Sequence, residues 1–363
     1  MSEQDPSTQI TESVEELWGI PLQPAGCRKC GQAHLVDASR LGQVCPNCAS
    51  GKLEAQPARL RAEPPELLVP YRKTQAEFRL VLENFTRPVW LAVDDFTIEK
   101  LLQRAMPVYW PMWLMDSNVF GAWQAEVGFD YRVKSSQESY IGNGWQTREV
   151  IETRQRWEPR AGQIARHYDN IHVPALTDHA RLVGLVGEYQ LNQAVPYDTA
   201  KLGKSILRIP DLLPESAWPQ AQANLDRAAA AECQKAAAVK YIRNFSVKAD
   251  YQKQHWTQLL LPMLVSYYTD DDGKAHPILI NGQSGVVGGA RLASQRKGWK
   301  WAGITAGIAA LVLMISLLLL VAGAFIPPLL AVGGVGAFIA IVLVFAAIVP
   351  AVWPWWWNRK TEK

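Results

Sequence analysis

Two apolar segments decide the fold of this chain: AGITAGIAALVLMISLLLLVAGAFI at residues 302–326 and LLAVGGVGAFIAIVLVFAAIVPAV at residues 329–352. Neither segment contains a charged residue, and only Pro327 and Pro328 lie between them. An α-helix rises about 1.5 Å per residue, so about 20 apolar residues cross the roughly 30 Å hydrocarbon core of a bilayer. Each segment is long enough, and the sequence predicts a transmembrane helical hairpin.

Basic and tryptophan residues flank the hairpin at the ends away from its turn. Lys and Arg favour the cytoplasmic side of a membrane, and Trp gathers at the membrane–water interface. We therefore expect residues 291–363 to be a membrane region whose two ends both face the cytoplasm. The predicted interface residues are Arg291, Arg296, Lys297, Lys300, Trp299, Trp301, Trp353, Trp355, Trp356 and Trp357.

The hairpin itself contains no ionisable side chain, whereas substrate and proton pathways through membranes usually need some. Small residues recur at a spacing of four, Gly303 with Gly307 and Gly333 with Ala337, and allow helices to approach closely. They predict either packing of the two spans on each other or assembly with a partner in the membrane.

Four cysteines occur as two Cys-x-x-Cys pairs, Cys27 with Cys30 and Cys45 with Cys48. In a reducing compartment this spacing indicates a metal site rather than disulfides. Four thiolates fill the tetrahedral shell of zinc and leave no position for water, so we expect zinc as a structural cofactor in a zinc ribbon. His34 is interpreted as a solvated loop residue. The few basic residues nearby favour a protein contact for the ribbon over nucleic acid.

The remaining sequence predicts an α+β protein with an antiparallel sheet. Helices are expected at 73–85, 94–104 and 219–243, and a meander of strands at 108–116, 119–133, 147–158 and 163–173, with Pro111 marking an edge or bulged strand. A further hairpin is expected from 258–269 and 276–280. The predicted segments are an acidic amino-terminal segment (1–22), the ribbon (23–53), a linker (54–68), a cytosolic α+β domain (69–290) and the membrane region (291–363) with spans at 302–326 and 329–352.

The sequence offers little chemistry for catalysis. It contains no phosphate-binding loop, nucleophile elbow or dinucleotide fingerprint, and the formal net charge of +3 gives little support for nucleic-acid binding. His167, His172 and His179 lie close in sequence, but the first two fall on one predicted strand at an odd separation and should face opposite sides unless a bulge intervenes. We predict that the protein is not an enzyme and assign no catalytic residues.

Several motifs together resemble a known family. These are the two cysteine pairs, Pro70-Tyr71, Val108-Tyr109-Trp110-Pro111-Met112-Trp113, Pro196-Tyr197-Asp198, Leu261-Pro262 and Asn281-Gly282-Gln283-Ser284-Gly285, followed by the terminal spans. The chain resembles bacterial membrane proteins with a zinc ribbon of the TFIIB type and two transmembrane segments, often labelled primosomal-protein-N-prime-like. The missing phosphate loop contradicts the helicase activity that this label suggests. Only the four cysteines carry over from the family residue by residue.

The resemblance implies a role in bacterial envelope stress. Such relatives are membrane anchors associated with SPFH-domain proteins, TPM-domain membrane proteins and PspA-type proteins. We therefore predict a scaffold that docks these partners at the bacterial inner (cytoplasmic) membrane, in contact with the lipid bilayer, and leave its oligomeric state open. A membrane-tethered nucleic-acid-binding or regulatory protein is the alternative, although nucleic acid is not the expected partner.

Overall fold

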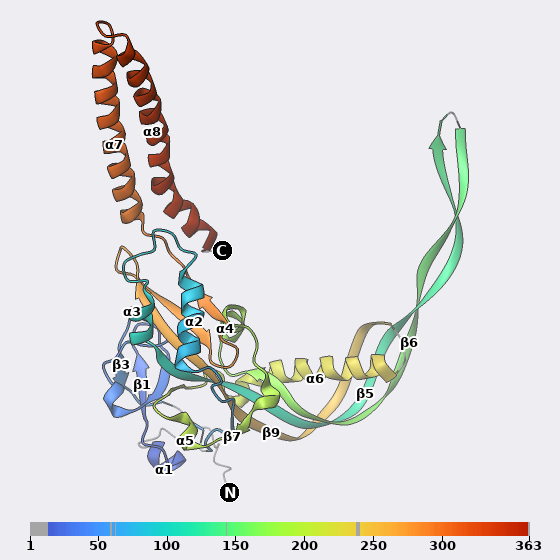
Figure 1. Ribbon diagram of the computed structural model, residues 1–363. Helices are drawn as coiled ribbons and strands as arrows, with labels where there is room; N and C mark the ends of the chain where they lie inside the picture. Colours follow the sequence, from blue (N-terminus) through green and yellow to red (C-terminus); the bar gives the residue numbers. More distant parts are fainter. Residues whose placement is uncertain (1–13, 59, 62, 143, 237–239, 362–363) are drawn as a thin grey trace.

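The computed structural model describes residues 14–58, 60–61, 63–142, 144–236 and 240–361. Residues 1–13 of the predicted acidic segment therefore lie outside the described residues. Within this range the protein is mixed α+β with one large sheet, a cluster of four cysteines near the amino end and two apolar helices at the carboxyl end. Figure 1 shows a body from which two features project, the helical hairpin α7–α8 and a long curved arm made of strands β5 and β6.

The sheet runs through the whole body. In order of neighbours its strands are β11 (Val287–Gly289), β10 (Ala275–Asn281), β9 (Tyr241–Thr269), β5 (Met106–Ile141), β8 (Ile206–Arg208), β2 (Ala33–Val36), β1 (Gln23–Cys27) and β3 (Leu53–Ala55). Off this path, β6 (Gly144–Pro174) pairs with β5, and β4 (Leu67–Leu68) pairs with β7 (Val195–Pro196) and β9. Pairing is antiparallel except for β4 with β9 and β5 with β8. Through β2 and β8, the strands around the cysteines continue the sheet of the body.

Short helices cover the body, and two long ones form the hairpin. They are α1 (Val14–Trp18), α2 (Gln75–Thr86), α3 (Ile98–Gln103), α4 (His179–Val186), α5 (Thr199–Leu202), α6 (Pro214–Ala236), α7 (Gln295–Ala322) and α8 (Pro328–Thr361). Helix α2 starts with a capping box, in which the Thr74 hydroxyl and the Glu77 carboxylate satisfy each other's backbone N–H groups. Helix α3 begins later than predicted because Thr97 caps it, accepting from the N–H of Lys100.

The predicted four-strand meander is wrong, because its segments form only two very long strands. The turn expected at residues 116–118 is a β-bulge within β5, where the register with both β6 and β9 shifts. The turn expected at residues 159–162 lies inside β6, where Pro159 pairs with Glu126. Among the described strands β6 pairs with β5 alone, so this proline lies on an edge strand and removes no central hydrogen bond.

Pro111 was predicted to mark an edge or bulged strand, yet it lies in β5 between two neighbours. It pairs with Leu260 of β9 on one side. On the other side β8 pairs as far as Tyr109 and β6 begins to pair at Met112, so the proline falls in the gap between them. A residue without an N–H group is tolerated there because no ladder bond is required of it.

Helix α6 lies along the base of the arm (Figure 1). Its buried residues recur every four positions and so lie along one side of the helix. They are Ala217, Ala221, Leu225, Ala229 and Cys233. This side packs on Trp113 and Tyr168 of the sheet. The helix was predicted to run to residue 243, but it ends at Ala236, and residues 241–243 already belong to β9. Residues 237–239 lie outside the described residues. β9 begins at Tyr241 rather than at the predicted Gln258 and so joins the arm.

Candidate metal centre, pocket and membrane anchor

The four cysteine sulfurs lie together at one end of the sheet. All four fall within 4.8 Å of one another. The Sγ atoms of Cys27 and Cys48 are 3.7 Å apart, as are those of Cys30 and Cys45. A tetrahedral centre with metal–sulfur bonds of about 2.3 Å holds its sulfurs about 3.8 Å apart. The residues therefore fit one four-coordinate metal ion.

Two similar turns present these sulfurs. In the first, the N–H of Gly31 donates to the carbonyl of Cys27, and in the second the N–H of Ala49 donates to the carbonyl of Cys45. Both residues have positive φ, 74° for the glycine and 53° for the alanine. Each pair of cysteines therefore wraps around the same turn geometry, which the Cys-x-x-Cys spacing predicts.

The thiols are partly or fully buried. Burial raises the pKa of Cys45 and of Cys30. Gly51 lies so close to the centre that a Cβ there would come 2.3 Å from the sulfur of Cys27. The amide of Gly51 also donates to the sulfur of Cys48, at 3.4 Å. A metal ion would hold the four thiolates and cross-link the two turns, and such a closed shell supplies structural support rather than catalysis.

The interpretation of His34 as a solvated loop residue is wrong. It lies on β2 with 1% of its surface exposed, and it is not part of the metal cluster. Burial and the positive charge of Arg208 lower its pKa to about 3, so the imidazole is neutral at pH 7. His34, Leu35 and Val36 are consecutive buried residues of β2, and His34 pairs with Arg208 of β8.

Sequence reasoning missed Arg208, which joins the metal centre to the body. Its side chain is 4% exposed and forms ion pairs with Asp178, at 3.0 Å, and Asp211, at 3.2 Å. The guanidinium also donates to Gln32 Oε1 at 2.8 and 3.1 Å, and to Asn47 Oδ1 at 3.4 Å. Gln32 follows the first cysteine pair and Asn47 lies within the second, so one buried cation contacts both turns.

The charges around Arg208 are balanced. Burial acts to raise the pKa of Asp178, but the attraction of Arg208 and Arg181 outweighs it and holds this pKa below its usual range. Arg181, which is largely exposed, donates to the same carboxylate at 2.8 Å. Asp178 therefore remains ionised and compensates the buried guanidinium, as a buried charge requires.

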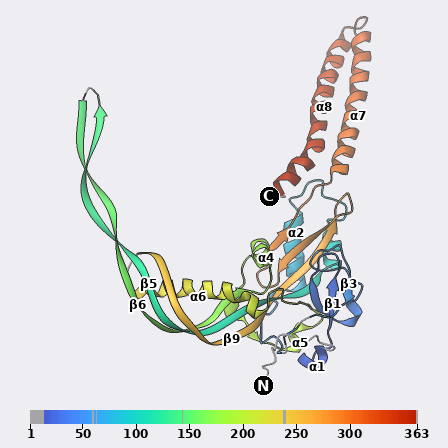
Figure 2. The same ribbon diagram turned by 180° about the vertical axis from the view of Figure 1, so that it is seen from behind.

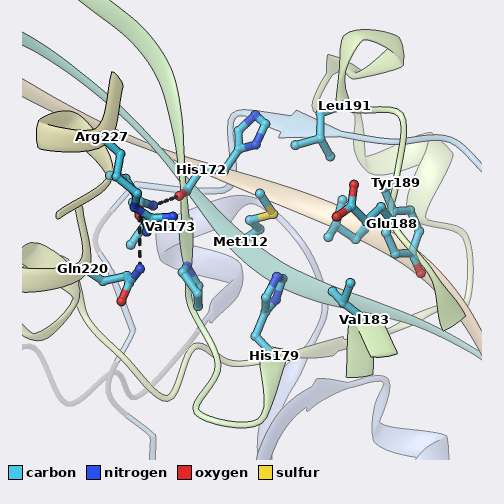
Figure 3. A pocket seen from close by; sticks show the side chains of 13 residues that line it. Met112, His172, Val173, His179, Val183, Glu188, Tyr189, Leu191, Gln220 and Arg227 are labelled. Carbon is cyan, nitrogen blue, oxygen red and sulfur yellow. Dashed lines mark hydrogen bonds between the residues drawn. The ribbon is translucent and has the colours of Figure 1, made fainter. Parts of the chain in front are cut away.

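A cavity of about 460 Å³ lies where α4, α6 and the base of the arm meet. Figure 3 shows the His172 and His179 side chains among its lining, with Arg227 and Glu188 toward opposite sides and Met112 between them. Burial lowers the pKa of both imidazoles. His167 does not reach the cavity; its ring nitrogens lie 2.6 Å from Asn118 and from Asp169. The register of β6 with β5 shifts between Tyr168 and Ile171, so strand alternation does not decide whether His167 and His172 face opposite sides. The cavity brings His172 and His179 together.

The chemistry of this cavity suits binding. Its lining contains no Cys, Ser or Thr nucleophile, and among the described residues the four cysteines are the only group arranged to hold a metal. Nδ1 of His179 is buried without a hydrogen-bond partner in the described chain. The cavity therefore combines an apolar surface around Met112, two imidazoles, and the oppositely charged side chains of Arg227 and Glu188.

Helices α7 and α8 are long and apolar enough to cross a membrane, and each contains an 18-residue stretch with a mean hydropathy of 2.8. They lie side by side (Figures 1 and 2). Small residues at intervals of seven line their contact: Ala302, Ala309 and Ser316 on α7, and Gly333, Ala340, Ala347 and Pro354 on α8. A period of seven keeps one seam of each helix facing the other, as in a coiled coil.

The glycines predicted to pack the hairpin divide between its two faces. A Cβ on Gly333 would lie 2.9 Å from the backbone nitrogen of Leu320, so this glycine permits close approach. Gly303 and Gly307 lie on the outer side, where a Cβ would meet nothing within 4 Å, and they are not used to pack the spans on each other. Ala337 is half-buried beside the seam.

The predicted interface residues also fall into two groups. Trp299, Trp301, Trp355 and Trp356 are exposed, between 47% and 64% of their surfaces. Trp353 and Trp357 instead stack on each other with ring centres 5.6 Å apart, and Trp90 of the body packs against Trp353. Lys300 and Arg296 line a polar hollow beside the hairpin base, together with Lys297.

The hairpin is seated on the body through specific hydrogen bonds. Asn358 of α8 exchanges hydrogen bonds with the backbone of Ala293, at 2.8 and 3.1 Å. Trp357 Nε1 donates to the carbonyl of Arg291. Lys297 Nζ forms an ion pair with Asp94 at 2.7 Å. The start of α7 and the end of α8 are thus fixed to the body.

An acidic loop of the body completes this seat. The loop between β9 and β10 places Asp271 at the start of α7, where its carboxylate accepts from Ser294 Oγ at 2.8 Å and from the N–H of Arg296 at 3.1 Å. A carboxylate at a helix amino end is stabilising because it satisfies free N–H groups and faces the positive end of the helix dipole. Hairpin and body therefore behave as one unit at this joint.

Comparisons of the chain with protein-family models, with curated proteins and with solved structures return no match.

Proposed function

We propose that the protein is a non-enzymatic scaffold anchored in the bacterial inner membrane, with both termini in the cytoplasm. The observation that carries the proposal is the seat of the hairpin. Two membrane-length helices with largely exposed apolar surfaces are bonded at their base to a large folded body, through Lys297 with Asp94 and through Ser294 and Arg296 with Asp271. Such an arrangement holds a protein surface at a fixed position beside the bilayer, which is what a docking platform requires.

The partners proposed for this platform are SPFH-domain, TPM-domain or PspA-type proteins in the response to envelope stress. This part rests on the resemblance of the motifs in the sequence. Zinc is the proposed metal, because four thiolates at tetrahedral spacing match its preference and leave no open coordination site.

The surroundings of the ribbon favour a protein contact over nucleic acid. Arg28 forms an ion pair with Glu54 at 2.7 Å, and Arg40 donates to the carbonyl of Lys204. Arg208 is buried between carboxylates. These cations are already partnered, so few remain for phosphate groups. Salt-dependent retardation of labelled DNA or RNA by the full zinc-loaded chain would support the nucleic-acid alternative instead.

Affinity purification tests the scaffold. The tagged full chain is cross-linked in native membranes and purified, and co-purifying proteins are identified by mass spectrometry. The matched control is Cys27→Ser, which removes one metal ligand and leaves the membrane hairpin unchanged. Enrichment of an SPFH-, TPM- or PspA-type protein by the wild type supports the proposal, and failure to enrich any of them contradicts it.

The cavity favours a second function, the binding of a small ligand that carries both charges. Arg227 and Glu188 stand toward opposite sides of an apolar floor (Figure 3). Native mass spectrometry of the full chain released from membranes is the direct test. A bound small molecule that is lost in Arg227→Ala and kept in Arg181→Ala, a substitution outside the cavity, supports this function. Identical spectra for all three chains count against it.

A further inference from the structure

The arm continues far beyond the body as a bare two-stranded ribbon. Gly128 is the last residue of β5 that pairs with β9, through Tyr241. From there, in the part of the chain that the structure describes, β5 and β6 pair with each other alone until Ile141 meets Gly144. At about 3.3 Å per residue this free part is about 40 Å long. This free part buries little apolar surface and therefore contributes little to the stability of the fold. We therefore looked for a contact that it could make outside the body.

The tip of the arm, residues 139–147, differs in charge from its shaft, the parts of β5 and β6 between Gly128 and the tip and between the tip and Trp157. The shaft carries charges that pair across the strands, such as Lys134 with Glu149 at 3.9 Å. Residues 139–147 contain no charged residue. Tyr140, Ile141 and Trp145 there are 61%, 61% and 72% exposed. The tip is therefore uncharged and carries two large exposed aromatic side chains, whereas the shaft is charged.

The aromatic side chains at the tip lie as a pair on one face. Tyr140 and Trp145 are direct cross-strand partners, and their ring centres are 5.5 Å apart in an edge-to-face arrangement. Tyr and Trp combine an apolar ring with a polar atom, so they favour the boundary between water and lipid. Ile141, the next residue of β5, adds apolar surface on the opposite face of the ribbon. The nearest charged residues are Glu138 on β5 and Arg148 on β6, and both lie outside the uncharged tip.

The direction of the arm matches that of the membrane hairpin. Figures 1 and 2 show the arm leaving the body sideways and then curving until its tip points the same way as α7 and α8. In both views the tip rises past the level at which these helices leave the body and stands level with the middle part of the hairpin. A bilayer that contains the helices would meet the tip from the same side.

We propose that the tip of the β5–β6 arm, formed by Tyr140, Ile141 and Trp145, inserts into the interfacial region of the bilayer that α7 and α8 span. The hairpin already confines the chain to the membrane, so this contact forms within one molecule and needs little intrinsic affinity. The body would then be held at two distant points, and its tilt relative to the membrane would be fixed. This inference concerns how the body is oriented and goes beyond the proposed scaffold function.

Photo-cross-linking in nanodiscs tests this contact with the full chain. The chain is reconstituted, one copy per disc, with phosphatidylcholine and phosphatidylglycerol that carry a diazirine in the headgroup-proximal part of the acyl chain. After irradiation and digestion with trypsin, lipid adducts are mapped by mass spectrometry. Cleavage after Lys134 and Arg148 releases residues 135–148, which contain the whole tip, and cleavage after Arg154 releases residues 149–154.

We expect adducts on peptide 135–148 and none on peptide 149–154. The variant Tyr140→Ser/Trp145→Ser should lose at least about tenfold of the tip adduct, since two large apolar surfaces leave the interface. Ile151→Ser is the matched control, because Ile151 is 65% exposed but lies farther down the shaft, and it should keep the adduct. Adducts on α7 and α8 report that each variant is inserted.

Two labelling patterns of the wild-type chain and one of a variant would overturn the proposal. One is the absence of lipid adducts on peptide 135–148 while α7 and α8 are labelled. The other is protection of the tip by protein, seen in undiluted native membranes as cross-links between peptide 135–148 and a second copy or another protein in place of lipid. Loss of the adduct to the same degree in Ile151→Ser would also contradict the assignment to the tip.

Discussion

Replacement of Arg208 by methionine should destabilise the body and loosen the metal centre together. Methionine keeps most of the buried stem but removes a guanidinium that is 4% exposed and bonded to Asp178, Asp211, Gln32 and Asn47. Breaking a buried ion pair from one side costs about 3–5 kcal/mol, because the partner charges stay behind. The two aspartates keep some contact with water, which places the expected loss near the lower end, at about 3 kcal/mol.

The assay is urea unfolding of the full chain in detergent micelles, followed by pulse proteolysis of the body, with release of metal to a colorimetric chelator as a second readout. The control is Arg181→Met, which removes an exposed partner of the same carboxylate and should cost less than about 1 kcal/mol. Adding Asp178→Asn and Asp211→Asn to Arg208→Met should recover part of the loss. A loss for Arg208→Met no larger than that for Arg181→Met would show that the buried guanidinium stabilises the body no more than the exposed one does.

Three further predictions follow from individual positions. Gly51→Ala places a Cβ against a ligand sulfur and should weaken metal binding by about 10- to 100-fold, as chelator competition would show, whereas the exposed neighbour in Lys52→Ala should leave it unchanged. Gly333→Leu should lower the free energy of unfolding of the hairpin by about 1–3 kcal/mol, because the larger side chain meets Leu320. The helical circular-dichroism signal on heating measures this loss. Gly303→Leu, on the outer face, is the control and should leave the signal unchanged. The folded pKa of about 3 for His34 lies below the unfolded value of about 6.5, so the unfolded chain binds the proton first and stability falls as pH decreases from about 6.5 toward 3. The slope from this group is about 1.4 kcal/mol per pH unit, and His34→Gln should flatten that part of the urea-derived stability profile; an unchanged slope would contradict the burial of this residue.

The metal cluster and the membrane helices could be predicted from the sequence because both signals are local. Spacing alone brings Cys27 near Cys30, and length with apolar composition suffices for a spanning helix. The arm could not be predicted, since alternating polar and apolar residues are the same in one long strand and in two short ones. Residues typical of turns, such as Pro159, then favoured the incorrect prediction of two short strands. Proline is tolerated within β6 because this strand pairs only with β5 among the described strands, so the other side of Pro159 needs no hydrogen bond.

The contacts that join the cysteine-containing turns and the helical hairpin to the body could not be predicted from the sequence either. Arg208 meets Gln32 across 176 residues of chain, and Lys297 meets the backbone of Ala92 across 205. Nothing near either residue in the sequence indicates its partner. Exposure likewise depends on the tertiary arrangement, which is why His34 was assigned to solvent although it belongs to a buried strand.

The function that we propose requires the chain to hold a partner at the inner membrane. The most direct measurement is the fraction of the partner found in membranes, determined by quantitative mass spectrometry of membrane and soluble fractions. We predict that deletion of the chain moves the SPFH-, TPM- or PspA-type partner away from the membrane or out of its membrane assembly. The full chain should restore the distribution, and the chain lacking residues 302–352 should not. A partner whose membrane fraction and assembly are the same with and without the chain would contradict the account.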